Sequence, residues 1–268
     1  MKLGALIAQT EARLRAARLH YGHGTDNPRD EAAYLVLRGL GLPFDQDLNL
    51  EVDDARVERL IRQRIEKRIP VAYLLKEAWL DGVPFYVDRR VIIPRSHIAA
   101  LLATKLHPGP VRRVLDLCTG SGCLAILAAR AFPRARVDAS DVSAAALAVA
   151  RINVRRHRME KRVRPVRSDL FSGLEDGNYD VIVSNPPYVT AAAMRRLPAE
   201  YRYEPGLALA AGRDGLDLVA RIVAEAPAQL APGGVLVCEV GDRRKAVERR
   251  FRRAPLIWPQ DEVFALHR

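Results

Sequence analysis

The second half of the chain, from Val111 onward, alternates short apolar runs with stretches of helical spacing. Apolar runs of this length predict buried strands, and the stretches between them predict the crossover helices of a parallel sheet. The predicted strands are Val111–Cys118, Arg136–Ser140, Val163–Arg167, Tyr179–Ser184 and Gly234–Val240. The predicted helices are Cys123–Ala131, Ser143–His157 and Asp217–Leu230, followed by a hairpin of Leu256–Trp258 and Val263–His267. The pattern therefore predicts an α/β fold.

The first 75 residues carry helical spacing throughout. Asn27 before Pro28 predicts a helix start, because the Asn side chain can accept an orphan amide proton and Pro occupies a position that needs no donor. A second helix follows Asp53 and ends before Pro70, and its apolar positions recur on one face. Those positions are Val57, Leu60, Ile61 and Ile65. We expect a small helical domain here.

A third pattern separates the two halves. Between Trp79 and Ile93 the chain alternates β-forming residues around Asp81-Gly82, which predicts a hairpin that ends at Pro94. We therefore expect a helical substrate-recognition domain over residues 1–75, a hairpin linker over 76–98 and a catalytic domain over 99–268.

Composition narrows the class of protein. The 268 residues are 49% hydrophobic and 28% charged, which excludes a disordered, collagenous or disulfide-scaffold protein. The longest stretch without a charge, Val181–Met194, contains two prolines and is too short to cross a bilayer. The N-terminus lacks a secretory apolar run, and the three cysteines are unclustered, without metal-ligand spacing. We expect a cytoplasmic protein with neither a membrane span nor a metal site.

The net charge of +11 admits two interpretations. Two local clusters carry much of the excess. The first contains Arg151, Arg155, Arg156, Arg158, Lys161, Arg162, Arg164 and Arg167, and the second contains Arg243, Arg244, Lys245, Arg249, Arg250, Arg252 and Arg253. Each cluster is either a solvated helix face or a contact with the ribosome or RNA, and the charge alone does not decide between them.

Candidate chemistry begins at the end of the first predicted strand, in the run Asp116-Leu117-Cys118-Thr119-Gly120-Ser121-Gly122. Gly120 and Gly122 let the backbone approach a ligand at the start of a helix. The turn also fits a dinucleotide site, with Ala125 as the third small residue, or a purely steric role. Asp116 argues against a pyrophosphate and favours a cationic ligand.

Two further aspartates follow the next two strands. Asp141 could accept both hydroxyl protons of a ribose. After the third strand, Asp169 could meet the amino group of an adenine, and Leu170 could pack on its ring. Each aspartate alone is more often a helix or turn cap. Taken together, a cation, a ribose and an adenine describe S-adenosylmethionine, and residues 111–268 resemble a class I, Rossmann-like methyltransferase that uses this cofactor and releases S-adenosylhomocysteine.

The most specific motif, Ser184-Asn185-Pro186-Pro187-Tyr188, follows the fourth predicted strand. It could simply end a strand. In this fold it resembles the motif of methyltransferases that act on planar amide or amino nitrogens. The Asn185 side-chain oxygen and the Pro186 carbonyl can accept the two protons of an NH2 group, and Tyr188 can pack on its plane. Cys118 and Cys123 are poor candidates for nucleophiles, because their apolar neighbours favour core packing.

Nearly the whole chain resembles the glutamine N5-methyltransferases, which modify either release factors or ribosomal protein L three of the large subunit. Both groups share the stretch that reads here Glu204-Pro205, Leu207-Ala208-Leu209 and Gly212-Arg213-Asp214-Gly215-Leu216. The linker, Ile93-Pro94-Arg95-Ser96-His97-Ile98, is similar to that of the ribosomal-protein group, as are Ala72-Tyr73-Leu74-Leu75, Glu77-Ala78-Trp79 and Leu197-Pro198-Ala199-Glu200-Tyr201-Arg202. Lys76 and His97 depart from the group's pattern.

This resemblance implies N5-methylation of a glutamine in that ribosomal protein, with ribosomal RNA of an assembling particle as a further partner. It implies a catalytic role for Asn185, Pro186 and Tyr188. The implied cofactor residues are Asp116, Cys118, Gly120, Gly122, Asp141, Asp169, Leu170 and Asn185, and the implied substrate residues are Asn185, Pro186, Pro187, Tyr188, Arg95 and Ser96. A turn-capping role for Arg95 and Ser96 remains the alternative.

Four other functions remain as alternatives. Release-factor methylation requires the same chemistry on a different protein. Amino methylation of a nucleic acid base fits the charge, but aromatic residues make up only 6% of the chain and no target-recognition domain follows the catalytic part. A non-catalytic assembly factor would not require the motif positions, which are intact. A nicotinamide dehydrogenase fits the glycine turn, but Asp116 and the Asn185 motif argue against it.

Overall fold

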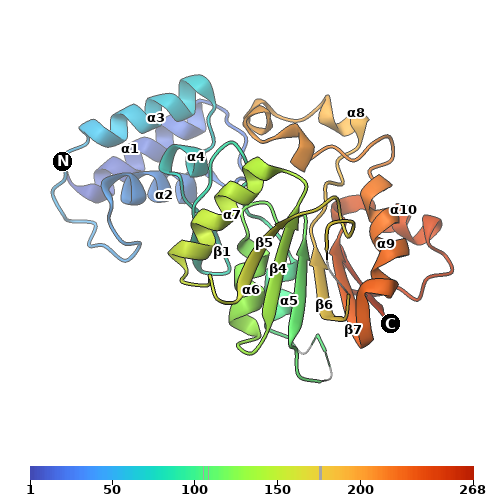
Figure 1. Ribbon diagram of the computed structural model, residues 1–268. Coiled ribbons are helices and arrows are strands. Elements are labelled where there is room, and N and C mark those ends of the chain that lie inside the picture. Colours follow the sequence, from blue (N-terminus) through green and yellow to red (C-terminus); the bar gives the residue numbers. More distant parts are fainter. Residues whose placement is uncertain (105, 108, 175–176) are drawn as a thin grey trace.

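The structure, a computed structural model, describes residues 1–104, 106–107, 109–174 and 177–268 (Figure 1). Within these residues the chain forms a seven-stranded sheet of order β5-β4-β3-β6-β7-β9-β8. The strands are β3 (Arg113–Leu117), β4 (Arg136–Asp141), β5 (Val163–Arg167), β6 (Tyr179–Ser184), β7 (Leu230–Glu239), β8 (Ile257–Gln260) and β9 (Val263–His267). Strands β3 to β7 are parallel, and β9 is antiparallel to both of its neighbours. The predicted α/β fold with a mostly parallel sheet is confirmed.

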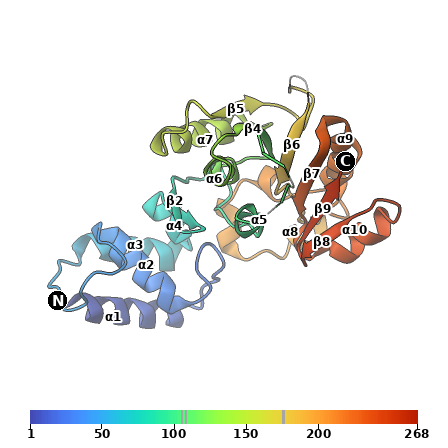
Figure 2. The same cartoon turned by 90° about the horizontal axis from the view of Figure 1, so that it is seen from below.

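Helices cover both faces of this sheet, as Figure 2 shows. The α-helices of this part are α5 (Ile98–Leu102), α6 (Cys123–Ala131), α7 (Ala144–Arg156), α8 (Ala191–Met194), α9 (Asp217–Gln229) and α10 (Arg244–Arg250). Successive residues of β3 face opposite sides: Val114 packs in the core with α5 and α6, whereas Leu115 and Leu117 pack with α9 and α10. None of the helices in the described part of the chain combines the length and apolar character needed to cross a membrane.

The N-terminal part is helical. It contains α1 (Leu3–Ala16), α2 (Pro28–Leu40), α3 (Ala55–Lys67) and α4 (Val71–Leu75). Asn27 accepts a hydrogen bond from the Asp30 amide at the start of α2, at 2.9 Å, so the predicted cap is confirmed. The apolar stripe of α3 packs against α1 and α2 in one core.

A β-hairpin links this part to the sheet around Asp81-Gly82, as the sequence predicts, but it ends at Phe85 rather than at Pro94, and residues 86–97 contain no strand. Strands β1 (Ala78–Leu80) and β2 (Val83–Phe85) pair antiparallel around Asp81 and Gly82, both of which have positive φ. Two positive φ angles at the centre of a two-residue turn match the twist of the flanking strands. The interior of the hairpin joins the core around α5 and α6 through Val83 and Phe85.

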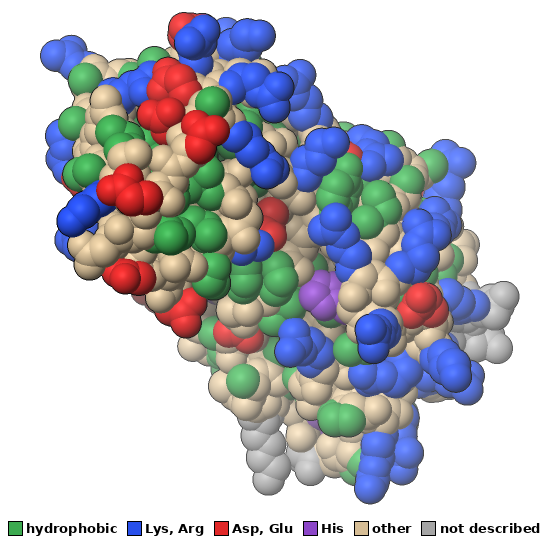
Figure 3. All heavy atoms as spheres, turned by 90° about the vertical axis from the view of Figure 1, so that its left-hand side faces the viewer, with side chains coloured by type: hydrophobic (Ala, Val, Ile, Leu, Met, Phe, Trp, Pro, Cys, Tyr) green, Lys and Arg blue, Asp and Glu red, His purple; other side chains and the backbone are tan. Residues whose placement is uncertain are grey.

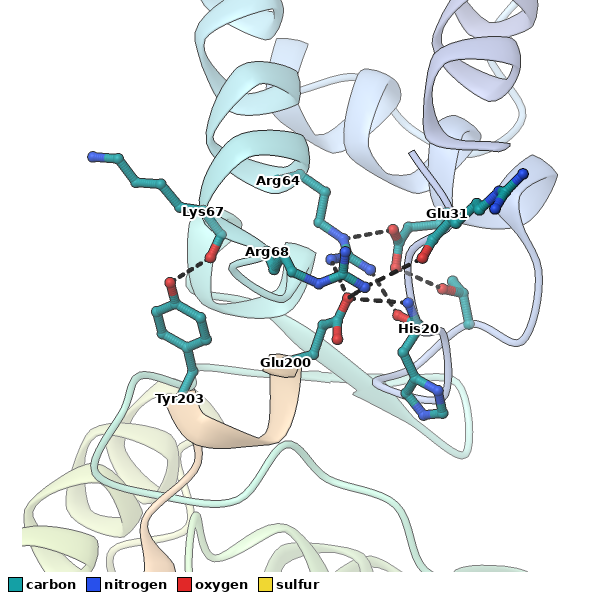
Figure 4. A network of polar contacts seen from close by, with 9 residues as sticks. His20, Glu31, Arg64, Lys67, Arg68, Glu200 and Tyr203 are labelled. Carbon is teal, nitrogen blue, oxygen red and sulfur yellow. Dashed lines mark hydrogen bonds and ion pairs between the residues drawn. The ribbon is translucent and has the colours of Figure 1, made fainter. Parts of the chain in front are cut away.

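One segment of the part that contains the sheet holds the helical part in place. Residues 185–216 pass over the end of the sheet beside α3 and α4 (Figure 1), and they include the 3-10 helices η1 (Ala199–Tyr203) and η2 (Gly206–Ala208). At η1, the buried Glu200 carboxylate lies 3.4 Å from Arg64 Nη1 and 2.9 Å from Arg68 Nη2 (Figure 4). Arg64 also donates to Glu31 Oε1, at 2.8 Å, and Tyr203 donates to the Lys67 carbonyl, at 2.5 Å.

This cluster should control stability through Arg64, whose side chain is 1% exposed. The change Arg64→Ala leaves two buried carboxylates, those of Glu31 and Glu200, without their shared cation. We expect it to lower the free energy of unfolding by about 3–5 kcal/mol, as measured by urea denaturation. Arg62→Ala, on the exposed face of the same helix, is the matched control and should change stability by less than about 0.5 kcal/mol. Equal effects of the two changes would contradict this account.

Candidate active site

A cavity of about 440 Å³ opens where the parallel strands end. It lies at the point where β3 and β6 are neighbours, so their crossover connections leave in opposite directions, and this is the usual ligand site of such sheets. Four predicted regions line it together: the glycine loop, the ends of β4 and β5, and the Asn185 motif. Its lining includes Cys118, Gly120, Asp141, Asp169, Leu170, Asn185, Pro186, Pro187, Tyr188, Arg95 and Ser96.

The glycine loop wraps around Asp141. Cys118 and Gly120 have positive φ, of 58° and 55°, which turns the loop back toward β4. Asp141 then accepts hydrogen bonds from the Gly120 and Ser143 amides, both at 2.9 Å. These two bonds fix the carboxylate at the cavity wall, and each of its oxygens keeps a lone pair for a further donor. Burial raises the pKa of Asp141. The geometry suits a ligand with vicinal hydroxyl groups.

Asp116 does not face the cavity as the sequence analysis expected. It lies inside β3, one residue before the strand ends, so its fully buried side chain points behind the loop. Its Oδ2 accepts from Thr119 Oγ1, at 2.5 Å, and from the Ala125 amide, at 2.9 Å. Gly122 also lies behind the lining, where an added Cβ would meet the Cβ of Ala150 at 3.2 Å. Both residues shape the loop.

The loop after β5 places Asp169 and Leu170 at the cavity. Leu170 is buried, with a φ of 48°, and supplies an apolar surface for a flat ring. Asp169 is exposed and accepts a hydrogen bond from Arg221, at 2.9 Å. Because an exposed ion pair of this kind contributes little, the Asp169 carboxylate can exchange Arg221 for a ligand donor at small cost.

The Asn185 amide has a fixed orientation. Its Nδ2 donates to the backbone carbonyl of Arg95, at 3.1 Å, and a carbonyl oxygen can only accept, so the nitrogen must point there. The Oδ1 atom therefore points the other way, and within the described residues it accepts no hydrogen bond. Two glycines hold Tyr188 nearby. An added Cβ would lie 2.7 Å from the Tyr188 ring at Gly241 and 2.5 Å from the Tyr188 carbonyl at Gly215.

Sequence reasoning missed Glu204, which controls Arg95. The buried Glu204 carboxylate accepts two parallel hydrogen bonds from the Arg95 guanidinium, at 2.7 and 2.6 Å, and a third from the Ile93 amide, at 3.0 Å. The Arg95 guanidinium also lies 5.4 Å from the ring centre of Tyr201, which lines the cavity. Arg95 is thus committed to Glu204, and its backbone carbonyl is held where it meets Asn185.

Glu239 at the end of β7 was missed as well. Ser96 Oγ donates to its Oε2, at 2.5 Å, and accepts from the Ile98 amide, at 3.2 Å, so Ser96 caps the turn into α5. Burial raises the pKa of Glu239. Burial also raises the pKa of the Cys123 thiol to about 12 and that of Cys118 still further, so neither is a thiolate nucleophile at neutral pH.

Known proteins share this architecture. The family model "Methyltransferase small domain" matches residues 97–199. A methyltransferase from Pyrococcus furiosus superposes with a TM-score of 0.51 at 19% identity, over 80% of this chain and 98% of that one. The hMettl16 catalytic domain superposes with a TM-score of 0.53 at 17% identity, over 82% of this chain and 83% of that one. The fold is that of a class I methyltransferase.

Sequence relatives narrow the class. A ribosomal protein uL3 glutamine methyltransferase from Bordetella pertussis is 52% identical, over 94% of this chain and 89% of the relative. A protein of the same name from Burkholderia pseudomallei is 49% identical, over 98% of this chain and 93% of the relative. The chain belongs to the family of ribosomal protein uL3 glutamine methyltransferases, which confirms the resemblance inferred from the linker and the Asn185 motif.

The Glu204 contact gives a first test of the site. Glu204→Gln removes one of the two parallel acceptors, so Arg95 loosens and the Asn185 amide loses its fixed orientation. We expect kcat to fall by about 10- to 100-fold, the range for losing a charge-assisted hydrogen bond, while the Kd for the methyl donor changes less than about 2-fold. Glu248→Gln, in an exposed ion pair on α10, is the control and should leave both constants unchanged. Parallel loss of binding and turnover would refute this role.

Asp116 gives a test by pH. Burial raises its pKa to about 7, so the folded protein holds this proton more tightly than the unfolded chain. Its contribution to stability is therefore present at low pH and is lost as the pH rises toward 7. Between pH 5 and pH 8, the unfolding free energy of the wild type should fall because of Asp116 by about 2–3 kcal/mol. In Asp116→Asn this part of the fall should be absent. The exposed Asp54→Asn should keep that decline, and a decline that persists in Asp116→Asn would exclude this group as its source.

Proposed function

We propose that this protein transfers a methyl group from S-adenosylmethionine to the side-chain nitrogen of a glutamine in ribosomal protein uL3. The names of its relatives, at 47–52% identity, support that substrate. The observation that carries the proposal is the orientation of the Asn185 amide, whose oxygen is free to accept while its nitrogen is held by Arg95. A ribosomal-protein substrate puts the enzyme in the cytoplasm.

The cavity residues fit the proposed methyl donor. When bound, S-adenosylmethionine supplies a methyl group on a positively charged sulfur. Asp141 would accept from the ribose hydroxyls, Leu170 would pack on the adenine, and Asp169 would accept from its amino group. Asp116 would not contact this donor, because its side chain lies behind the glycine loop, where its Oδ2 accepts from Thr119 and from the Ala125 amide.

The proposed role of the Asn185 motif is to hold the glutamine amide. Asn185 Oδ1 and the Pro186 carbonyl would accept its two N–H protons, and the Tyr188 ring would pack on its plane. An amide nitrogen is a weak nucleophile because its lone pair is shared with the carbonyl. Two acceptors bound to the N–H groups increase the electron density on the nitrogen and orient its lone pair toward the methyl carbon. Positioning and electrostatics then lower the barrier. The proton can leave after transfer, so no general base is assigned.

The proposal is tested by transfer of a tritiated methyl group into ribosomal protein uL3 that lacks the modification. Asn185→Ala removes one acceptor, so we expect turnover to fall by about 100-fold or more, with the Kd for S-adenosylmethionine changed less than about 3-fold by calorimetry. Asn49→Ala, at an exposed asparagine in the helical part, is the matched control and should retain wild-type turnover.

Three results would overturn parts of this proposal. Equal loss of turnover and cofactor binding in Asn185→Ala would refute the assigned role of the amide. Methylation of a release factor at a Gly-Gly-Gln tip, without methylation of uL3, would show that the substrate is a release factor. Labelling of naked DNA or RNA would show that the substrate is a nucleic acid base.

A further inference from the structure

A second hollow lies at the opposite end of the sheet from the active site. It has a volume of about 830 Å³ and is formed where β3, β4 and β5 begin and α7 ends. β4 connects the two sites, since it runs from Arg136 in the hollow to Asp141 in the cavity. At about 3.3 Å per strand residue, the two sites lie roughly 17 Å apart. A ligand of the hollow therefore does not enter the active site.

The lining of this hollow is strongly basic. Seven Arg and Lys residues line it against two carboxylates, Asp138 and Glu160. The basic residues are Arg113, Arg136, Arg151, Arg155, Lys161, Arg162 and Arg164. Figure 3 shows Lys and Arg side chains gathered on the side of this face where α7 and β5 lie, with Asp and Glu concentrated on the other side.

Some of these cations are used by the fold. Arg164 pairs with Asp138, at 2.8 Å, and Arg162 donates to the Ala129 carbonyl, at 2.6 Å. Arg113 lies 4.0 Å from Asp138 and donates to the Gly177 carbonyl. Three of the cations behave differently: within the described residues, no carboxylate lies within ion-pair distance of Arg151, Arg155 or Lys161, and all three are exposed. Basic residues at the C-terminus of α7 complement its dipole. That effect accounts for Arg155 but not for Arg151 in mid-helix or for Lys161 beyond the helix.

We propose that this hollow binds the phosphate backbone of double-stranded RNA. Six of its seven cations are arginines, whose planar fork matches phosphate oxygens. The lining contains no aromatic side chain for stacking a base or anchoring a peptide. Its apolar members are Val137, Val154, Val163 and Pro165. Contacts of this kind favour a helical polyanion without regard to sequence. The choice of RNA over DNA rests on the proposed function, because a ribosomal protein meets ribosomal RNA.

The test compares two variants that each remove three positive charges. The first variant carries Arg151→Gln, Arg155→Gln and Lys161→Gln, all in the hollow. The second carries Arg249→Gln, Arg252→Gln and Arg253→Gln, which lie at and beyond the end of α10. The probe is a 30-base-pair RNA duplex of arbitrary sequence, titrated between 50 and 200 mM salt without the methyl donor. We expect the first variant to bind the duplex at least 10-fold more weakly. The slope of log affinity against log salt concentration should become less steep by about 2–3, roughly one for each lost phosphate contact. The second variant should bind within 2-fold of wild type.

A second measurement separates this proposal from the proposed function. The variant of the hollow should methylate isolated uL3 within 2-fold of the wild-type rate and should methylate uL3 bound to ribosomal RNA at least 5-fold more slowly. Wild-type RNA affinity in that variant, or an equal loss in both variants, would overturn the site. Competition by polyglutamate as effective as that by RNA would assign the hollow to an acidic polypeptide and overturn the RNA proposal. Methylation of isolated uL3 slowed as much as that of RNA-bound uL3 would also overturn the proposed role of the hollow.

Discussion

The hydrogen bond from the Asn185 amide to the Arg95 carbonyl is the interaction on which the site depends. An asparagine side chain can turn over and exchange its donor for its acceptor, and either arrangement would fit a cavity filled with water. A backbone carbonyl at 3.1 Å permits only one of them. It presents an acceptor to the cavity, which is what an incoming NH2 group requires. The rest of the segment, from the Glu204 carboxylate to the Tyr201 ring, keeps that carbonyl in place.

Three buried acidic side chains behind the cavity wall organise the region around Asn185. Asp116 ties the glycine loop to α6, Glu204 fixes the linker, and Glu239 fixes the turn into α5. Each accepts at least two hydrogen bonds, which offset part of the cost of its burial. The cavity therefore has a rigid wall of backbone, and its few free polar atoms are left for ligands.

The sequence predicted the elements whose signals are local. Strand positions, the Asn27 cap, the hairpin at Asp81-Gly82 and the motif after β6 were all found where short-range patterns put them. The N-terminal part was predicted to be helical, but no bounds were given for α1, whose buried positions include the polar Thr10. Asp116 was expected at the cavity, but it lies within β3 on the side opposite to Leu115 and Leu117, because neighbouring strand residues face opposite sides.

The contacts that sequence reasoning could not supply are those between distant segments. Glu200 lies 136 positions from Arg64, and Glu204 lies 109 from Arg95. Both glutamates stand in stretches that the family resemblance singled out, but neither helical nor strand periodicity assigns them a partner. The remaining signal was two glutamates four residues apart in a chain rich in arginine.

The Glu200 cluster also bears on how such enzymes can be recombined. The helical part is held to the rest by an apolar cluster, in which Ala72 and Tyr73 pack with Ala146 and Val149, and by charged groups whose geometry is specific. The charged groups tolerate a new neighbour less easily than the apolar ones do. A helical part grafted from another methyltransferase would bury Glu200 without Arg64 and Arg68. The segment 199–204 and the helix α3 must therefore be inherited as a pair, and chimeras should be cut outside both.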